Sequence, residues 1–238
     1  MNHMLAKRAA AEFLGTGVLV ATVVGSGIMG TLLSDNLAVT LLINALATVA
    51  VLAVLIWAFG PISGAHFNPV VSGVEMVRRE MPILEGVIYI VAQVIGACAG
   101  AILANLMFAL PAVNISTRER TGGNIWLGEI VATAGLLLVI GALTRTGRGT
   151  LGAALVPAWI GAAYFFTSSS FANPAVAVGR SLTDTFSGIA PASVPLIIVF
   201  QIVGAAVGAL LTEYFYPRRG VAPEPLDLPE PIHKGPHA

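Results

Sequence analysis

Long apolar runs separated by short polar stretches dominate the hydrophobic pattern of the chain. Each run is long enough for a helix of about 20 residues that crosses a bilayer, and we predict spanning helices over residues 9–33, 37–59, 83–109, 125–143, 150–167 and 193–215. The longest connector is polar and covers residues 110–124. The pattern therefore predicts an all-α membrane protein with six transmembrane helices.

Two shorter apolar segments begin at Asn68 and Asn173, each of which is followed directly by proline. Asn is a favoured helix N-cap, and Pro is favoured at the first helical position. A helix from Asn68 to Arg78 would rise about 15 Å, and one from Asn173 to Asp184 about 16 Å, half of the hydrocarbon core of a bilayer. Residues 60–79 and 168–184 are therefore predicted to be re-entrant, each with a half-helix that begins near mid-depth.

The two halves of the chain repeat the same features. Glu12 near the start of the first span corresponds to Glu129 in the fourth, and Gln93 in the third span corresponds to Gln201 in the sixth. Because each half has three spans, an odd number, the second half is expected to lie inverted with respect to the first. Inverted repeats place the functional site at the interface between them.

Composition agrees with a membrane protein, because 56% of the residues are hydrophobic and only 10% are charged, against about 25% charged in soluble domains. The net charge of zero offers no basic field for nucleic acid, and the single cysteine, Cys98, excludes an internal disulfide and a Cys-based zinc site. We expect no cofactor and no metal. The predicted domain covers residues 1–216, with repeats at 1–110 and 124–216, and a Pro-rich tail at 217–238 is predicted to be disordered.

Basic residues predict the orientation, because Lys and Arg gather on the cytoplasmic side of membrane proteins. One side would carry Lys7, Arg8, Arg78, Arg79, Arg145, Arg148, Arg218, Arg219 and Lys234, and the other Arg118 and Arg120. Both termini are therefore predicted to be cytoplasmic, with the chain in the cell (inner) membrane.

The two segments Gly64-Ala65-His66-Phe67-Asn68-Pro69-Val70 and Phe171-Ala172-Asn173-Pro174-Ala175 resemble the paired Asn-Pro-Ala motifs of the aquaporin, or major intrinsic protein, family. The resemblance covers roughly residues 8–216. It implies an aquaporin-like inverted repeat of three plus three helices with two half-helices, one pore per chain, and a homotetramer. The implied function is passive passage of small neutral solutes and water across the lipid bilayer, without catalysis.

Irregular backbone is tolerated at membrane depth only where it is buried in protein or lines water. The loops before the two half-helices are therefore predicted to line a lumen through Gly64, Ala65, His66, Phe67, Phe171 and Ala172. Asn68 and Asn173 would point amide N–H groups into this lumen, where the positive ends of two helices oppose cations. Simple helix capping by both asparagines is the plainer interpretation and is compatible with pore lining. His66 could respond to pH, but we favour a role in bracing its loop.

The spacing of the family places the narrowest ring at Thr48, Gly161, Ser170 and Val176. Relatives carry an arginine where this sequence has Val176, and no position of this ring is aromatic. A wider, less charged ring would pass uncharged solutes larger than water, such as glycerol, other small polyols, urea or arsenous acid. The ring resembles that of a bacterial aquaglyceroporin branch associated with arsenite.

Three charged side chains in apolar surroundings each have two interpretations. Arg180 lies one helical turn beyond Val176 and could supply positive charge at the outer mouth, although pairing with a loop is the interpretation that we favour. Glu12 and Glu129 could relay protons. The resemblance suggests instead that each accepts hydrogen bonds from the backbone of a re-entrant loop, and we favour this anchoring role.

Other functions remain as alternatives to a solute channel. The first is a water-selective aquaporin, and the second is a secondary transporter, which also uses inverted repeats and broken helices. A transporter would need a carboxylate for a coupling ion beside the half-helix ends, and Glu75 lies well beyond Asn68. An intramembrane enzyme is disfavoured because the sequence has no Gly-x-Ser-x-Gly or His-Glu-x-x-His motif.

Overall fold

The structure, a computed structural model, describes residues 3–168 and 171–218, which form helices and no strand. Six helices are long and apolar enough to cross a membrane: α1 (His3–Leu33), α2 (Leu37–Ser63), α4 (Ile83–Met107), α5 (Gly123–Arg145), α6 (Gly152–Phe166) with the 3-10 turn η1 (Gly149–Leu151) before it, and α8 (Val194–Phe215) after η3 (Pro191–Ser193). Two short helices, α3 (Pro69–Val77) and α7 (Pro174–Gly179), begin after the two asparagines. The predicted all-α fold is confirmed. Most of the predicted disordered tail, residues 219–238, lies outside the described residues.

Of the element boundaries that differ from the prediction, two have clear local reasons. Helix α2 continues through Pro61 to Ser63, beyond the predicted end at residue 59. It ends at Gly64, which has a left-handed φ of 88° and donates its N–H to the carbonyl of Gly60 at 3.0 Å. Helix α7 is shorter than predicted, because the chain tightens after Gly179 into the 3-10 turn η2 (Arg180–Leu182).

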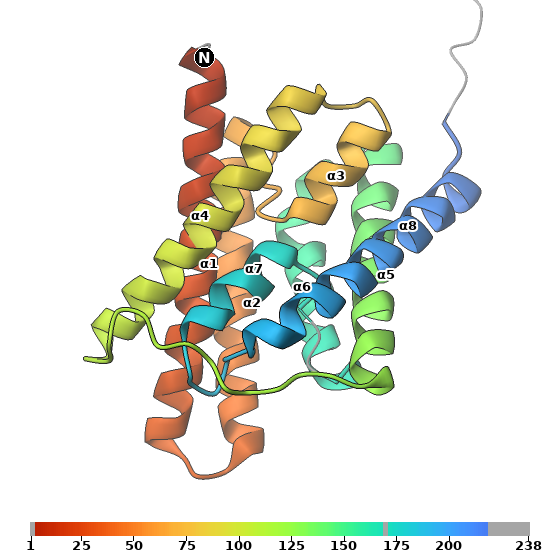
Figure 1. Cartoon of the computed structure of the whole chain (residues 1–238). Coiled ribbons are helices and arrows are strands. Elements are labelled where there is room, and N and C mark those ends of the chain that lie inside the picture. The colour runs from red at the N-terminus through yellow and green to blue at the C-terminus, as the bar shows by residue number, and fades with distance from the viewer. Residues whose placement is uncertain (1–2, 169–170, 219–238) are drawn as a thin grey trace, which may run out of the picture.

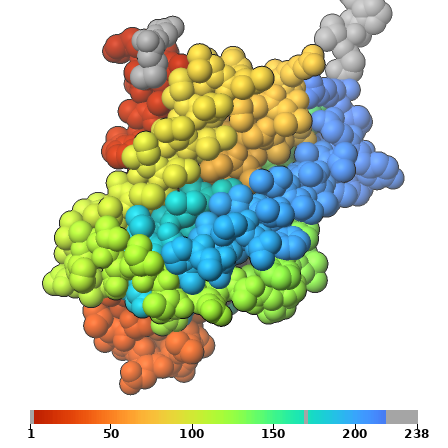
Figure 2. Space-filling view, in the orientation of Figure 1, coloured from red at the N-terminus to blue at the C-terminus, as the bar shows by residue number. Residues whose placement is uncertain are grey.

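The repeat is visible in how the long helices pack. Helix α1 packs along α4, and α5 packs along α8 in the same way in the second half (Figure 1). Glycines permit both close approaches, since a Cβ on Gly100 would clash with the carbonyl of Gly17, and one on Gly208 with the carbonyl of Ala134. On the face shown in Figure 2, α7 is visible between α4 and α8.

The short helices α3 and α7 lie between the two packed pairs (Figure 1). Asn68 caps α3 by accepting the N–H of Val70 at 3.1 Å, and Asn173 caps α7 by accepting the N–H of Ala175 at 3.0 Å. The N-terminus and the end of α8 lie toward the same end of the molecule, whereas the α1–α2 loop and the α4–α5 connector, residues 108–122, lie toward the other (Figure 1).

Candidate functional site

The two capping asparagines meet in the centre of the molecule. The amide nitrogen of Asn68 donates to the carbonyl of Ala172 at 2.7 Å, and that of Asn173 donates to the carbonyl of Phe67 at 2.8 Å. Each Asn therefore caps its own helix with its oxygen and binds the opposite loop with its nitrogen. An amide nitrogen carries two hydrogens, so each Asn keeps a second N–H for a passing molecule.

Phe67 and Ala172, the residues directly before the two asparagines, have left-handed backbones, with φ of 48° and 51°. Such conformations cost about 1–3 kcal/mol each for residues other than glycine and persist only where the surroundings impose them. Their N–H groups are held by buried carboxylates, that of Phe67 by Glu12 at 2.7 Å and that of Ala172 by Glu129 at 3.1 Å. The strained turns present the carbonyls of Phe67 and Ala172 to the opposite asparagines.

Glu12 and Glu129 hold equivalent positions in the two halves. Glu12 also accepts the N–H of His66 at 3.0 Å, and Glu129 the N–H of Phe171 at 3.1 Å. Gln93 donates to Glu12 at 2.8 Å, and Gln201 donates to Glu129 at 2.9 Å. The contacts are those of the loop-anchoring role predicted from the resemblance.

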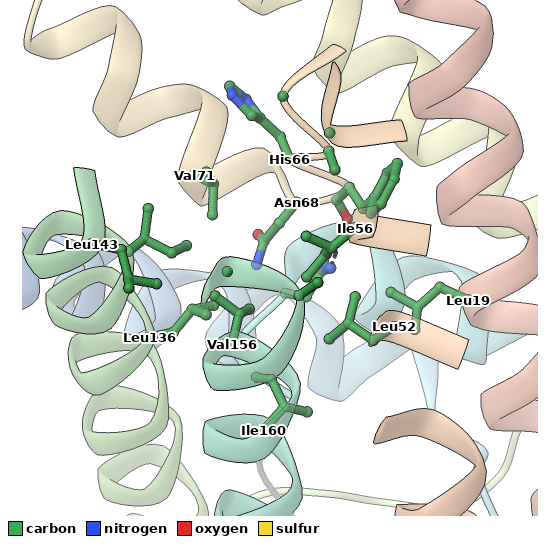
Figure 3. Close-up of a pocket in the computed structure, with 18 of the residues that line it drawn as sticks. Leu19, Leu52, Ile56, His66, Asn68, Val71, Leu136, Leu143, Val156 and Ile160 are labelled. Carbon is green, nitrogen blue, oxygen red and sulfur yellow. Dashed lines mark hydrogen bonds between the residues drawn. The ribbon is translucent and has the colours of Figure 1, made fainter. Parts of the chain in front are cut away.

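A cavity of about 780 Å³ runs past both asparagines. One side is formed by apolar side chains of the long helices, among them Leu19, Leu52, Ile56, Leu136, Val156 and Ile160, and the loop before α3 forms another (Figure 3). Of the predicted loop residues, Gly64, Ala65, His66, Phe67 and Phe171 line the cavity, whereas Ala172 is fully buried beside it.

His66 is braced within its loop. Its Nδ1 lies 3.0 Å from the hydroxyl of Ser72, and its ring packs edge-on against Tyr89 with centroids 5.4 Å apart. These contacts agree with the bracing role that we favoured from the sequence.

One end of the cavity is lined by Thr48, Tyr164, Phe171 and Val176, and we call it the Tyr164 end. The hydroxyls of Thr48 and Tyr164 lie 3.1 Å apart and join α2 to α6 there. Thr48 is 3% exposed and Val176 is 5% exposed. The four lining side chains at this end carry no charge.

The structure corrects the assignment of Gly161 to this end. Gly161 does not line the cavity, and a Cβ there would lie 2.6 Å from Cγ2 of Val49, so this position faces α2. Because α6 continues as regular helix to Phe166, the cavity-lining residues recur every four positions from Val156 through Ile160 to Tyr164. The Tyr164 end therefore contains an aromatic side chain, contrary to the prediction. Ser170, the remaining predicted member, lies outside the described residues.

Sequence reasoning missed two participants. Tyr164 lies within the predicted span 150–167 and could have been found from the helical spacing of four residues that links it to Ile160. Arg120 lies in the α4–α5 connector, and its guanidinium lies 5.5 Å from the centre of the Phe171 ring. No periodic pattern in the sequence relates that connector to a re-entrant loop.

Arg180 is 3% exposed and does not line the cavity. Its guanidinium carbon lies 3.5 Å from the centre of the Phe171 ring, and its Nε donates to the carbonyl of Ser187. The structure therefore shows the loop-pairing contact that we favoured. The cation–π distance also places the positive charge directly against a cavity-lining ring.

The cavity lining also contains Glu75, a residue of α3, and ion pairs surround the end of this helix. Arg145 pairs with Glu213 at 2.6 Å and with Glu80 at 3.7 Å. Arg78 lies 3.5 Å from Glu213. These ion pairs tie the end of α3 and the loop after it to the ends of α5 and α8.

The α4–α5 connector is fastened to the segment that follows α7. The Asp184 carboxylate accepts the backbone N–H of Thr117 at 2.9 Å and its hydroxyl at 3.1 Å. These bonds lower the pKa of Asp184 from its ordinary value, with the backbone N–H making the largest contribution. Burial lowers the pKa of Arg120 in the same connector, and repulsion from Arg118 lowers it further.

Comparison with known proteins gives consistent matches. The chain matches the family described as Major intrinsic protein over residues 2–172. It is 47% identical over 211 residues to an aquaglyceroporin of Rhizobium meliloti, covering 88% of this chain and 90% of the relative. It is 30% identical over 240 residues to an aquaporin of Methanothermobacter marburgensis, covering 88% and 97%. The X-ray structure of the aquaglyceroporin from Plasmodium falciparum superposes with a TM-score of 0.64 at 22% identity, covering 90% of this chain and 96% of that one.

Proposed function

The chain belongs to the major intrinsic protein family, whose members are membrane channels and not enzymes, and from this premise we propose that its pore passes small uncharged solutes larger than water. The solutes that we propose are glycerol-like polyols and neutral metalloid acids such as arsenous acid, together with water. The similarity to an aquaglyceroporin at 47% identity supports the polyols.

The observation that carries this proposal is the chemistry of the Tyr164 end. Val176 lines the cavity directly after the Asn173 box, where the family resemblance places an arginine. A valine is shorter and offers no charge or hydrogen bond donor. Pore diameter and lining donors determine selectivity in such channels, so this exchange favours neutral solutes with carbon or metalloid substituents over water alone.

The middle of the cavity suits a molecule with hydroxyl groups on one side. The free N–H groups of Asn68 and Asn173 can donate to a hydroxyl oxygen, and the carbonyls of the loop before α3 can accept its proton. Apolar side chains such as Leu52 and Ile160 contact the hydrocarbon side of the solute. A permeant exchanges water hydrogen bonds for protein ones at little cost in free energy.

The proposal also covers the orientation of the chain, its membrane and its oligomeric state. The N-terminus and the end of α8 lie toward one end of the molecule (Figure 1), and nine Lys and Arg residues are predicted on that side. We place both termini in the cytoplasm and the chain in the inner membrane. A homotetramer is proposed from the family resemblance alone.

A water-selective channel is the second candidate, and one observation favours it. The hydrogen bond between Thr48 and Tyr164 joins two walls of the cavity at 3.1 Å. A cross-link of this kind narrows the passage, and narrow passages select water.

Stopped-flow light scattering on proteoliposomes separates the two candidates. We expect swelling in inwardly directed gradients of glycerol and of arsenous acid that exceeds swelling of protein-free liposomes. Water flux without flux of either solute would contradict the proposal and favour the water-selective channel.

A bulky substitution at Val176 tests whether solutes pass through the Tyr164 end of the cavity. Val176→Phe should reduce glycerol flux more than water flux, because the phenyl ring fills the Tyr164 end. Val91→Phe is the matched control, since Val91 is 51% exposed on α4 and its enlargement leaves the cavity intact. Equal glycerol flux in the two variants would show that the solute takes another path.

A further inference from the structure

Two arginines share one cavity-lining aromatic ring. The guanidinium carbon of Arg180 lies 3.5 Å from the centre of the Phe171 ring, and that of Arg120 lies 5.5 Å from it. Phe171 lines the cavity at the Tyr164 end, whereas neither arginine does. Two positive charges are thus held at the back of an uncharged wall.

Backbone carbonyls of one loop hold both arginines in place. Arg120 donates from Nε to Gly188 at 2.9 Å and from Nη2 to Phe186 at 3.2 Å. Arg180 donates from Nε to the carbonyl of Ser187. Carbonyls position a guanidinium and satisfy its N–H groups, but they leave its unit charge in place.

The charge of the pair is incompletely neutralised. Among the described residues neither arginine forms an ion pair with a carboxylate, and Nη1 of Arg180 is buried without a hydrogen bond partner. Glu129 is the carboxylate whose charge acts on both, and it already accepts bonds from two loop N–H groups and from Gln201. One negative charge against two positive charges leaves a net positive charge beside the Tyr164 end.

We propose that Arg120 and Arg180 form the electrostatic barrier of this pore against cations, acting through the Phe171 ring from behind the wall. The inference rests on the proposed solute channel. Charges in a poorly polarisable wall act over longer distances than charges in water, and fixed positive charge beside a pore excludes protons and other cations. Because the positive charge lies behind an aromatic ring, the surface of the lumen itself carries no charge. A neutral solute with a large apolar part therefore does not contact a cation that has lost its water.

If the two arginines form this barrier, removal of either charge should raise the proton leak without a matching change in solute flux. Proteoliposomes loaded with a pH-sensitive dye and clamped with valinomycin report proton leak, and swelling in glycerol reports solute flux on the same preparation. The ratio of proton leak to glycerol flux should rise about tenfold in Arg180→Met, because one unit charge is removed from a weakly screened site. Arg120→Met removes the other charge and should raise the ratio in the same direction.

Arg118→Met is the matched control, because Arg118 is an exposed arginine of the same connector, and its ratio should equal that of the wild type. A wild-type ratio in folded Arg180→Met would overturn the proposal. Should Arg180→Met fail to fold, a wild-type ratio in Arg120→Met would overturn it equally. Loss of folded protein in both methionine variants would assign the pair a purely structural role and also refute the barrier. Absence of glycerol flux in the wild type would instead refute the proposed channel function.

Discussion

Glu12→Gln tests how the first re-entrant loop is held. One carboxylate oxygen of Glu12 accepts the hydroxyl of Ser63 at 2.6 Å and the N–H of His66 at 3.0 Å. The other accepts the N–H of Phe67 at 2.7 Å and the amide of Gln93 at 2.8 Å. The substitution keeps the size and shape of the side chain and replaces one acceptor oxygen by an NH₂ donor.

The magnitude follows from the donors that lose an acceptor. If the new NH₂ takes the second position, the N–H of Phe67 and the amide of Gln93 are both left facing a donor. If the NH₂ instead takes the first position, the Ser63 hydroxyl can rotate to accept it, and only the N–H of His66 is left facing a donor. The side chain adopts this less costly orientation. A buried unsatisfied donor costs about 1–3 kcal/mol, so the expected loss is about 1–3 kcal/mol.

Thermal unfolding in detergent and glycerol flux in proteoliposomes measure the effect together. Glu12→Gln should melt below the wild type and lose flux. Glu129→Gln should show a loss of similar size, because its less costly orientation also leaves one backbone N–H, that of Phe171, facing a donor. Glu119→Gln, at an exposed connector position, is the control. A Glu12→Gln protein that melts and conducts like Glu119→Gln would refute the anchoring role.

Three further predictions concern the cavity, the helix packing and the connector. Tyr164→Ala should raise the flux of erythritol relative to glycerol in swelling assays, because a large ring leaves the cavity end; an unchanged ratio would mean that this end does not limit size. Gly100→Ala should lower the melting temperature by a cost of about 1–3 kcal/mol, since a Cβ would clash with the carbonyl of Gly17, whereas Gly73→Ala, with nothing within 4 Å of an added Cβ, should not. The lowered pKa of Asp184 means that its bonds to the connector are present above the ordinary carboxyl pKa and are lost as the pH falls through the lower folded value. The protection factors of the connector amides should therefore fall in that acid range, and protection factors that do not change with pH and equal those of Asp184→Asn would contradict this.

The long helices could be predicted because a span is a local property. Any run of about 20 apolar residues satisfies its own backbone hydrogen bonds as a helix in lipid. The half-helices could be predicted for a similar reason, since Asn68 and Asn173 cap the helices that follow them within three residues.

The error at Gly161 shows where counting along the chain fails. The spacing of the family from the Asn-Pro boxes placed Gly161 in the ring. In the structure the cavity face of α6 contains Ile160 and Tyr164 instead. Gly161 follows the lining residue Ile160 by one position, and one position turns a side chain by about 100° around the helix, so the assignment fails although the helix itself is predicted correctly.

The sequence by itself determined the spans, their inverted repeat, the two asparagine caps and the apolar character of Val176, because each depends on residues near one another in the chain. Only the tertiary structure decided which side chains share the Tyr164 end and that Arg120 and Arg180 meet at Phe171. Those contacts join a connector, a re-entrant loop and the end of a half-helix. Their geometry depends on how irregular segments fold across the helix bundle. The hydrophobic periodicity of the sequence carries no information about this folding.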